Sequence, residues 1–124
     1  MKLSEFYNGD RTVLSFEVFP PKKTSSVETV YNTIAELQSL KPDYISVTYG
    51  AGGSAANNYT CDIASLIKNK FNIEAMAHLT CVNSTKEDVD KVLNELKENN
   101  IEIEPMLDNY DIFNIYIDNN FTFE

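Results

Sequence analysis

A single carboxylate interrupts an apolar stretch, SFEVFPP, near the start of the chain. Side chains alternate between the two faces of an extended strand, so Glu17 lies on the face opposite Phe16 and Val18. A carboxylate half-buried in such apolar surroundings is desolvated, which favours its protonated form. Glu17 is therefore predicted to be a general acid, and an ion pair with Lys22 or Lys23 at the rim of the fold is the simpler alternative.

Two later stretches also carry polar groups. In DYISVTYGAGGS, Thr48 and Tyr49 precede a glycine-rich loop, and such loops let a backbone approach a ligand closely. His78, the only histidine, shares a strand face with Met76 and Thr80 in AMAHLTC. Each feature has a simpler explanation, because a glycine-rich connection can be just a tight loop and a lone histidine is more often a satisfied core residue.

Three strands must position these groups. They are expected at Thr12–Phe19, Asp43–Tyr49 and Ile73–Cys81, which are rich in β-branched and aromatic residues, and Pro20 and Pro21 end the first of them. Each strand places polar groups at or near its carboxyl end. This coincidence favours one shared site over three separate structural explanations.

A helix is expected after each strand, because apolar residues recur there at helical intervals. Ser25 and Glu28 have the spacing of a capping box before the first helix. Ser84 and Glu87 repeat that spacing before the third helix, which is expected to stop at 99–100, an Asn-Asn pair. The expected apolar faces are Val27, Val30, Ile34 and Leu37, then Ile63, Leu66, Ile67 and Phe71, then Val89, Val92, Leu93 and Leu96.

Alternating strands and helices predict an α/β fold with parallel strands and right-handed crossovers. A doubly wound sheet usually carries G-x-G-x-x-G after its first strand, whereas this chain has Pro-Pro-Lys-Lys there. The predicted fold is therefore an incomplete (β/α)8 TIM barrel, comprising its first three or so strand–helix units, since a complete one needs roughly 250 residues. Residues 101–107 could start a fourth strand, which Pro105 interrupts.

Length and composition exclude several classes of protein. The 124 residues fit a single folding unit, and the formal charge of −9 disfavours nucleic acid and membrane surfaces as partners. The chain has no apolar run long enough to cross a bilayer and no secretory signal at its start, so a cytoplasmic protein is expected. Cys61 and Cys81 are expected to be reduced thiols, and they make a poor metal site with one histidine.

SFEVFPPK, DYISVTYGAGGS, the spaced Thr60 and Ile63, and AMAHLTC resemble, in that order and spacing, the amino-terminal motifs of the methylenetetrahydrofolate reductase family. The resemblance covers about residues 14–101. It implies an eight-stranded barrel that binds FAD, and a hydride that passes from NADH or NADPH through the flavin to 5,10-methylenetetrahydrofolate. The product would be 5-methyltetrahydrofolate, which places the chain in one-carbon metabolism and methionine biosynthesis.

The resemblance also implies roles for individual residues. Glu17 matches the family's catalytic general acid, which assists opening of the five-membered ring of the folate. Thr48 matches a position that meets the nicotinamide substrate, and Tyr49, Ala51 and His78 match positions that contact the flavin. No metal is implied.

The chain departs from the family after residue 101. The family continues with a strand ending in Leu-Arg-Gly-Asp, whereas this chain has IEIEPMLDNYD, so no role is carried onto Asp108. We therefore expect a partial barrel over residues 1–101 and a divergent tail over 102–124, produced by truncation or by a change of reading frame near 102. The expected activity of such a chain is impaired or absent.

Two other functions remain open at this point. A partial barrel leaves sheet edges uncovered, so the chain could be a non-catalytic protein that associates with another copy or another chain. A small metal-assisted hydrolase using Glu17 and His78 is the weakest alternative, because a catalytic zinc usually has three protein ligands.

Overall fold

The computed structural model describes residues 3–21, 26–49, 59–79 and 84–105, the last four of them by their backbone alone. Several expectations lie outside these residues: Ser25, Lys22 and Lys23, the glycine-rich loop with Ala51, Thr80, Cys81, Asp108 and the tail beyond it.

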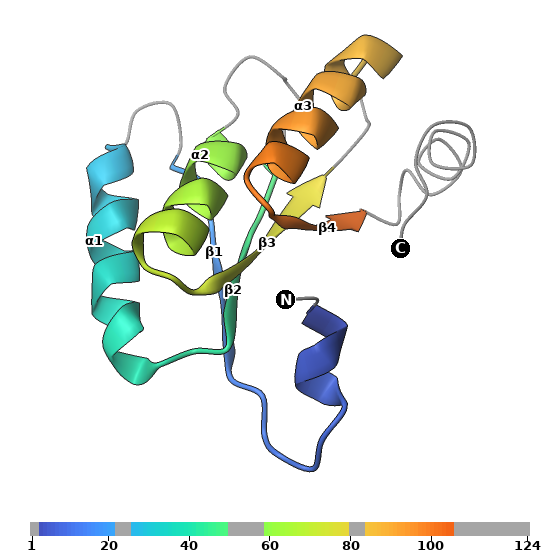
Figure 1. The fold of residues 1–124 in the computed structure, drawn as a ribbon. Coiled ribbons are helices and arrows are strands. Elements are labelled where there is room, and N and C mark those ends of the chain that lie inside the picture. The colour runs from blue at the N-terminus through green and yellow to red at the C-terminus, as the bar shows by residue number, and fades with distance from the viewer. Residues whose placement is uncertain (1–2, 22–25, 50–58, 80–83, 106–124) are drawn as a thin grey trace.

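Four parallel strands form one sheet in the order β1-β2-β3-β4. The helices α1, α2 and α3 lie side by side on one face of this sheet (Figure 1). A doubly wound sheet has helices on both faces and a reversal in its strand order, so the barrel-type α/β fold is confirmed. The strands are β1 (Ser15–Val18), β2 (Tyr44–Val47), β3 (Glu74–Leu79) and β4 (Glu102–Pro105), and the helices are α1 (Val27–Leu37), α2 (Tyr59–Ser65) and α3 (Lys86–Glu98).

Burial alternates along β3 because only one face of the sheet packs against the helices. Along β3, Ala75, Ala77 and Leu79 are buried, whereas the residues between them are partly exposed. Each large apolar side chain in this core contributes roughly 1.5–3 kcal/mol of burial free energy. The helices supply Ile34 from α1, Ile63 from α2 and Leu93 with Leu96 from α3.

The helix boundaries differ from the sequence expectation by one residue. The N-cap of α1 is Ser26, whose hydroxyl accepts a hydrogen bond from the backbone N–H of Glu28 at 3.1 Å. The capping box of α3 joins Thr85 and Asp88, so the prediction of Ser84 with Glu87 was wrong. An Asp at the third helical position can reach back to the cap as a Glu does, and the Thr85 backbone N–H donates to its carboxylate at 2.9 Å.

Shorter helical segments complete the described chain. A 3₁₀ helix, Leu3–Tyr7, precedes β1, and a second one, Gln38–Leu40, extends α1. A π-helical turn, Leu66–Lys70, continues α2, so the second helix reaches almost to the expected end. Among the described residues, every helix is too short or too polar to span a bilayer.

A polar clamp fixes the start of β1 against the start of β2. Two nitrogens of Arg11 donate to the Asp43 carboxylate at 2.8 and 3.0 Å, and the Leu14 backbone N–H donates to it at 2.9 Å. The Asp43 backbone N–H in turn donates to the Leu14 carbonyl at 2.8 Å. The Arg11 guanidinium, followed by the Leu14 N–H, lowers the pKa of Asp43 because both stabilise its ionised form.

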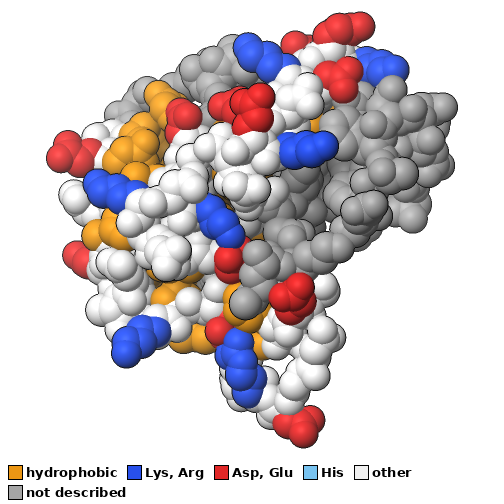
Figure 2. All heavy atoms as spheres, in the orientation of Figure 1, with side chains coloured by type: hydrophobic (Ala, Val, Ile, Leu, Met, Phe, Trp, Pro, Cys, Tyr) orange, Lys and Arg blue, Asp and Glu red, His pale blue; other side chains and the backbone are white. Residues whose placement is uncertain are grey.

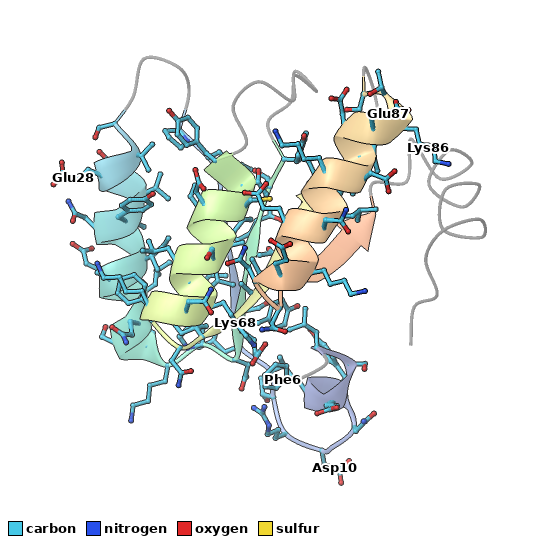
Figure 3. The ribbon with its side chains drawn as sticks, turned by 45° about the horizontal axis from the view of Figure 1, so that its top comes forward. Phe6, Asp10, Glu28, Lys68, Lys86 and Glu87 are labelled. Atoms are coloured by element: carbon cyan, nitrogen blue, oxygen red, sulfur yellow. The ribbon has the colours of Figure 1, made fainter. Side chains whose placement is uncertain are left out.

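The two ends of the sheet are therefore distinct. Figure 3 shows Glu28 and Glu87, at the starts of α1 and α3, at one end of the molecule, and Phe6 and Asp10 at the other. Phe6 stacks on Tyr44, and the hydroxyl groups of Tyr7 and Tyr44 lie 2.7 Å apart at that second end. The carboxyl ends of the strands, where barrel enzymes place their sites, are at the first end.

We expect Thr85→Ala to lower the free energy of unfolding by about 1 kcal/mol, because it removes the N-cap of α3. Ser84→Ala is the matched control, and its effect should stay within about 0.5 kcal/mol. Urea unfolding followed by circular dichroism measures both variants. Equal losses in the two, or a larger loss in Ser84→Ala, would contradict the observed capping box.

Acid should weaken the clamp. The folded-state pKa of Asp43 lies below its unfolded value, so its contribution is complete above the unfolded value of about 3.9 and is lost as pH falls through the folded value. Asp43→Asn should lower stability at pH 7 and flatten the loss of stability below about pH 4. The stability of Arg11→Gln should lie between that of the wild type and that of Asp43→Asn, because this variant keeps the hydrogen bond from the Leu14 N–H to Asp43. If the free energy of unfolding fell equally steeply below pH 4 in the wild type and in Asp43→Asn, the stabilising role of the clamp would be refuted.

Candidate functional site

Glu17 lies on the face of the sheet opposite the helices. This face, called the inner face below, carries Glu17 of β1, Ser46 of β2, and Met76 and His78 of β3. The Glu17 side chain is 47% exposed. The sequence predicts apolar surroundings for Glu17. The described side chains that contact its carboxylate are instead the polar Ser46 and His78.

Glu17 and His78 meet across the intervening strand. The His78 Nε2 atom lies 3.5 Å from Oε1 of Glu17, although β1 and β3 are separated by β2. His78 is mostly buried, with 12% of its side chain exposed. The structure thus brings together two of the residues predicted to form the site.

Ser46 was missed by the sequence analysis. It pairs with Glu17 in the β1–β2 register, its Oγ lies 3.5 Å from Glu17 Oε1, and it is only 6% exposed. The signal was present in the sequence, because Ser46 is two residues before Thr48 and so shares its strand face. Alternation along the strand assigns Ser46 to this face, whereas its place beside Glu17 depends on the β1–β2 register.

Thr48 lies just beyond the end of β2. Its backbone N–H donates to the Val18 carbonyl at 3.0 Å, which continues the pairing with β1 to the carboxyl end of that strand. Thr60, in the first turn of α2, donates from its hydroxyl to the Thr48 carbonyl at 3.0 Å. Thr48 is therefore held to both the neighbouring strand and the following helix.

Tyr49 is placed differently. It packs against the hydrophobic core, to which the helices contribute, and so is not grouped with Glu17 and His78 on the inner face. Ala51 lies outside the described residues, as do Lys22 and Lys23, which were the alternative partners of Glu17. The described site consists of Glu17, Ser46, Thr48 and His78.

No other candidate site among the described residues offers comparable chemistry. No three His, Cys, Asp or Glu side chains in that part of the chain form a cluster that could hold a metal ion. An open groove of about 620 Å³ lies on the helix side, away from Glu17, and is lined by Tyr31, Asp62, Ser65, Leu66, Asn69 and Lys70. Acidic and basic side chains are interspersed over the face shown in Figure 2, so its negative charge is not gathered into one patch.

The arrangement is suited to proton transfer. A carboxylic acid can give up a proton, and a hydroxyl or imidazole beside it can hydrogen-bond the carboxylate that remains. All of these groups lie at or near the carboxyl ends of parallel strands, where barrel enzymes carry their catalytic residues.

The chain is similar in sequence to known proteins over most of its length. Residues 2–103 match the sequence model of methylenetetrahydrofolate reductase. Methylenetetrahydrofolate reductase (NADH) 1 of Zea mays is 38% identical over 101 residues, which are 82% of this chain and 17% of the maize protein. The 5,10-methylenetetrahydrofolate reductase of Escherichia coli is 39% identical over 88 residues, which are 71% of this chain and 29% of that protein.

The chain thus spans less than a third of either relative. The match nevertheless includes every strand that contributes to the candidate site. This chain belongs to the methylenetetrahydrofolate reductase family.

Proposed function

We propose that this chain supplies the acid-bearing part of a flavin-dependent oxidoreductase that reduces 5,10-methylenetetrahydrofolate to 5-methyltetrahydrofolate with NAD(P)H. The observation that carries the proposal is the contact of Glu17 with His78 on the inner face, within a family match that covers residues 2–103. The reaction itself follows from the family.

The polar groups of the inner face are chemically suited to FAD. An imidazole and a hydroxyl group, from His78 and Thr48, provide both donors and acceptors, which the edge of an isoalloxazine ring also requires. His78, Thr48 and, by the family pattern, Tyr49 and Ala51 would hold the cofactor and the nicotinamide. FAD, when bound, supplies the hydride relay that no side chain of this chain can provide.

Glu17 is proposed as the general acid for the folate. Its proton would pass to a ring nitrogen of the substrate while the adjacent carbon–nitrogen bond opens, which gives an iminium ion that accepts hydride. A carboxylic acid positioned in this way contributes typically 10²–10⁴-fold to the rate. Glu17 has no role in our proposal for oxidation of NAD(P)H.

We propose that these 124 residues do not complete the reaction by themselves. The relatives are more than twice as long as this chain, and their additional residues would supply further walls of the flavin and folate sites. The proposed boundary separates a barrel-derived part, residues 1–101, from a divergent part, residues 102–124, which lacks the family's Leu-Arg-Gly-Asp.

A non-catalytic role in association is the second candidate. Within the described residues, β1 and β4 are the outer strands of the sheet, and Leu14 and Phe19 beside β1 are 42% and 66% exposed. Uncovered strand edges with exposed apolar residues favour pairing with another chain. Sedimentation at micromolar concentration that showed only a folded monomer would exclude self-association as this role.

The visible spectrum separates the two candidates. We expect the purified chain to stay yellow after it has been mixed with FAD and the unbound flavin has been removed by desalting, because the donors of the inner face are present. Subsequent addition of NADH should bleach it slowly or not at all if the missing walls bind the nicotinamide. A chain that is colourless after incubation with millimolar FAD and desalting would remove the support for a flavin site.

Glu17→Gln should separate the two half-reactions in a preparation that binds FAD. Flavin reduction by NADH should keep its rate, whereas transfer to the folate should fall about a hundredfold or more, because an amide cannot donate the acid proton. Stopped-flow absorbance measures both steps. Glu28→Gln, on the exposed start of α1, is the matched control. Loss of both half-reactions in Glu17→Gln would instead indicate a structural role.

A further inference from the structure

Ser46 is a polar residue in β2, where it is buried together with the two residues beside it. Its strand neighbours Ile45 and Val47 are fully buried aliphatic residues, and Ser46 itself is 6% exposed. A buried hydroxyl requires a hydrogen-bond partner to offset its lost hydration. Its two acceptors are the Phe16 carbonyl and Oε1 of Glu17, each at 3.5 Å.

Both described contacts of the Glu17 carboxylate converge on the same oxygen. Ser46 Oγ and His78 Nε2 each lie 3.5 Å from Oε1. Within the described part of the chain, Oε2 has no such contact. The two oxygens of Glu17 are therefore not equivalent.

We propose that Ser46 is a positioning residue, which together with His78 holds Oε1 of Glu17 so that the acid proton is carried and released by Oε2. The inference rests on the proposed role of Glu17 as general acid. Ser46 itself touches neither substrate nor cofactor in this scheme.

The chemistry of the step explains why a donor at Oε1 helps. When the Oε2–H bond breaks, its electron pair stays on the carboxylate, and the proton forms an N–H bond on the folate ring. Negative charge then spreads onto Oε1, where the Ser46 hydroxyl donates to it more strongly than to the neutral acid. Because the same hydroxyl can turn to the Phe16 carbonyl, it stays satisfied in both states of Glu17.

A kinetic comparison tests this role in a preparation that transfers hydride. Ser46→Ala should slow transfer to the folate about tenfold, as expected for one hydrogen bond to a charged group, and leave flavin reduction unchanged. Ser46→Thr keeps the hydroxyl and should recover most of the rate. Ser15→Ala makes the same change on the same sheet face, two residues before Glu17, and should have no effect.

A measurement without turnover keeps the inference separate from the proposed function. In solution NMR of the labelled chain, the Glu17 methylene protons should show cross-peaks to the His78 ring and one dominant χ1 rotamer. Ser46→Ala should weaken these cross-peaks and average the rotamers, whereas Ser46→Thr and Ser15→Ala should preserve them.

The outcomes are distinct. Unchanged cross-peaks and rotamers in Ser46→Ala would overturn the positioning role, whatever the activity. If Glu17 is ordered in the wild type and loses this order in Ser46→Ala, in a chain that retains no FAD, the result would support positioning while removing the support for the proposed flavin site. Equal slowing of both half-reactions in Ser46→Ala would show that Ser46 serves the fold alone.

Discussion

The register of β1 against β2 is the constraint on which the candidate site depends. Asp43 sets it at the amino ends of the strands, because its carboxylate accepts from the Leu14 N–H and its own N–H donates to the Leu14 carbonyl. Pairing then runs in step to Glu17 and Ser46. A slip of one residue would turn Glu17 toward the helices and Val18 toward the inner face. Hydrogen bonds at one end of the sheet thus determine the position of an acid at the other.

The two faces of the sheet have different roles: one packs in the core and the other carries the polar groups of the candidate site. The helix side buries aliphatic residues such as Ile45, Val47 and Leu79, and these make the main contribution to folding. The inner face can therefore carry polar residues without loss of the core. Ser46 shows the limit of this separation, because it is buried although it lies on the inner face, and a buried hydroxyl is kept only where acceptors are within reach.

The spacing of apolar residues predicted the features that short stretches of sequence determine. The three helices and the strands were found from apolar spacing, and the face of Glu17 followed from alternation. The helix caps were misplaced by one residue because Ser84 and Thr85 are adjacent hydroxyl residues, and both have an acidic residue three positions later. The neighbours of Glu17 were missed for a different reason. Parity assigns a residue to a face, whereas its contacts depend on the cross-strand register, which no single strand encodes.

Among the described residues, the acid and its partners come from β1, β2 and β3. Catalysis places a further demand on this site. With 47% of its side chain exposed, Glu17 is open to water. Electrostatic and acid–base contributions grow when water is excluded. A surface that covers the inner face, whether from further strand–helix units or from another chain, is therefore what would convert a correctly oriented carboxylate into an effective acid.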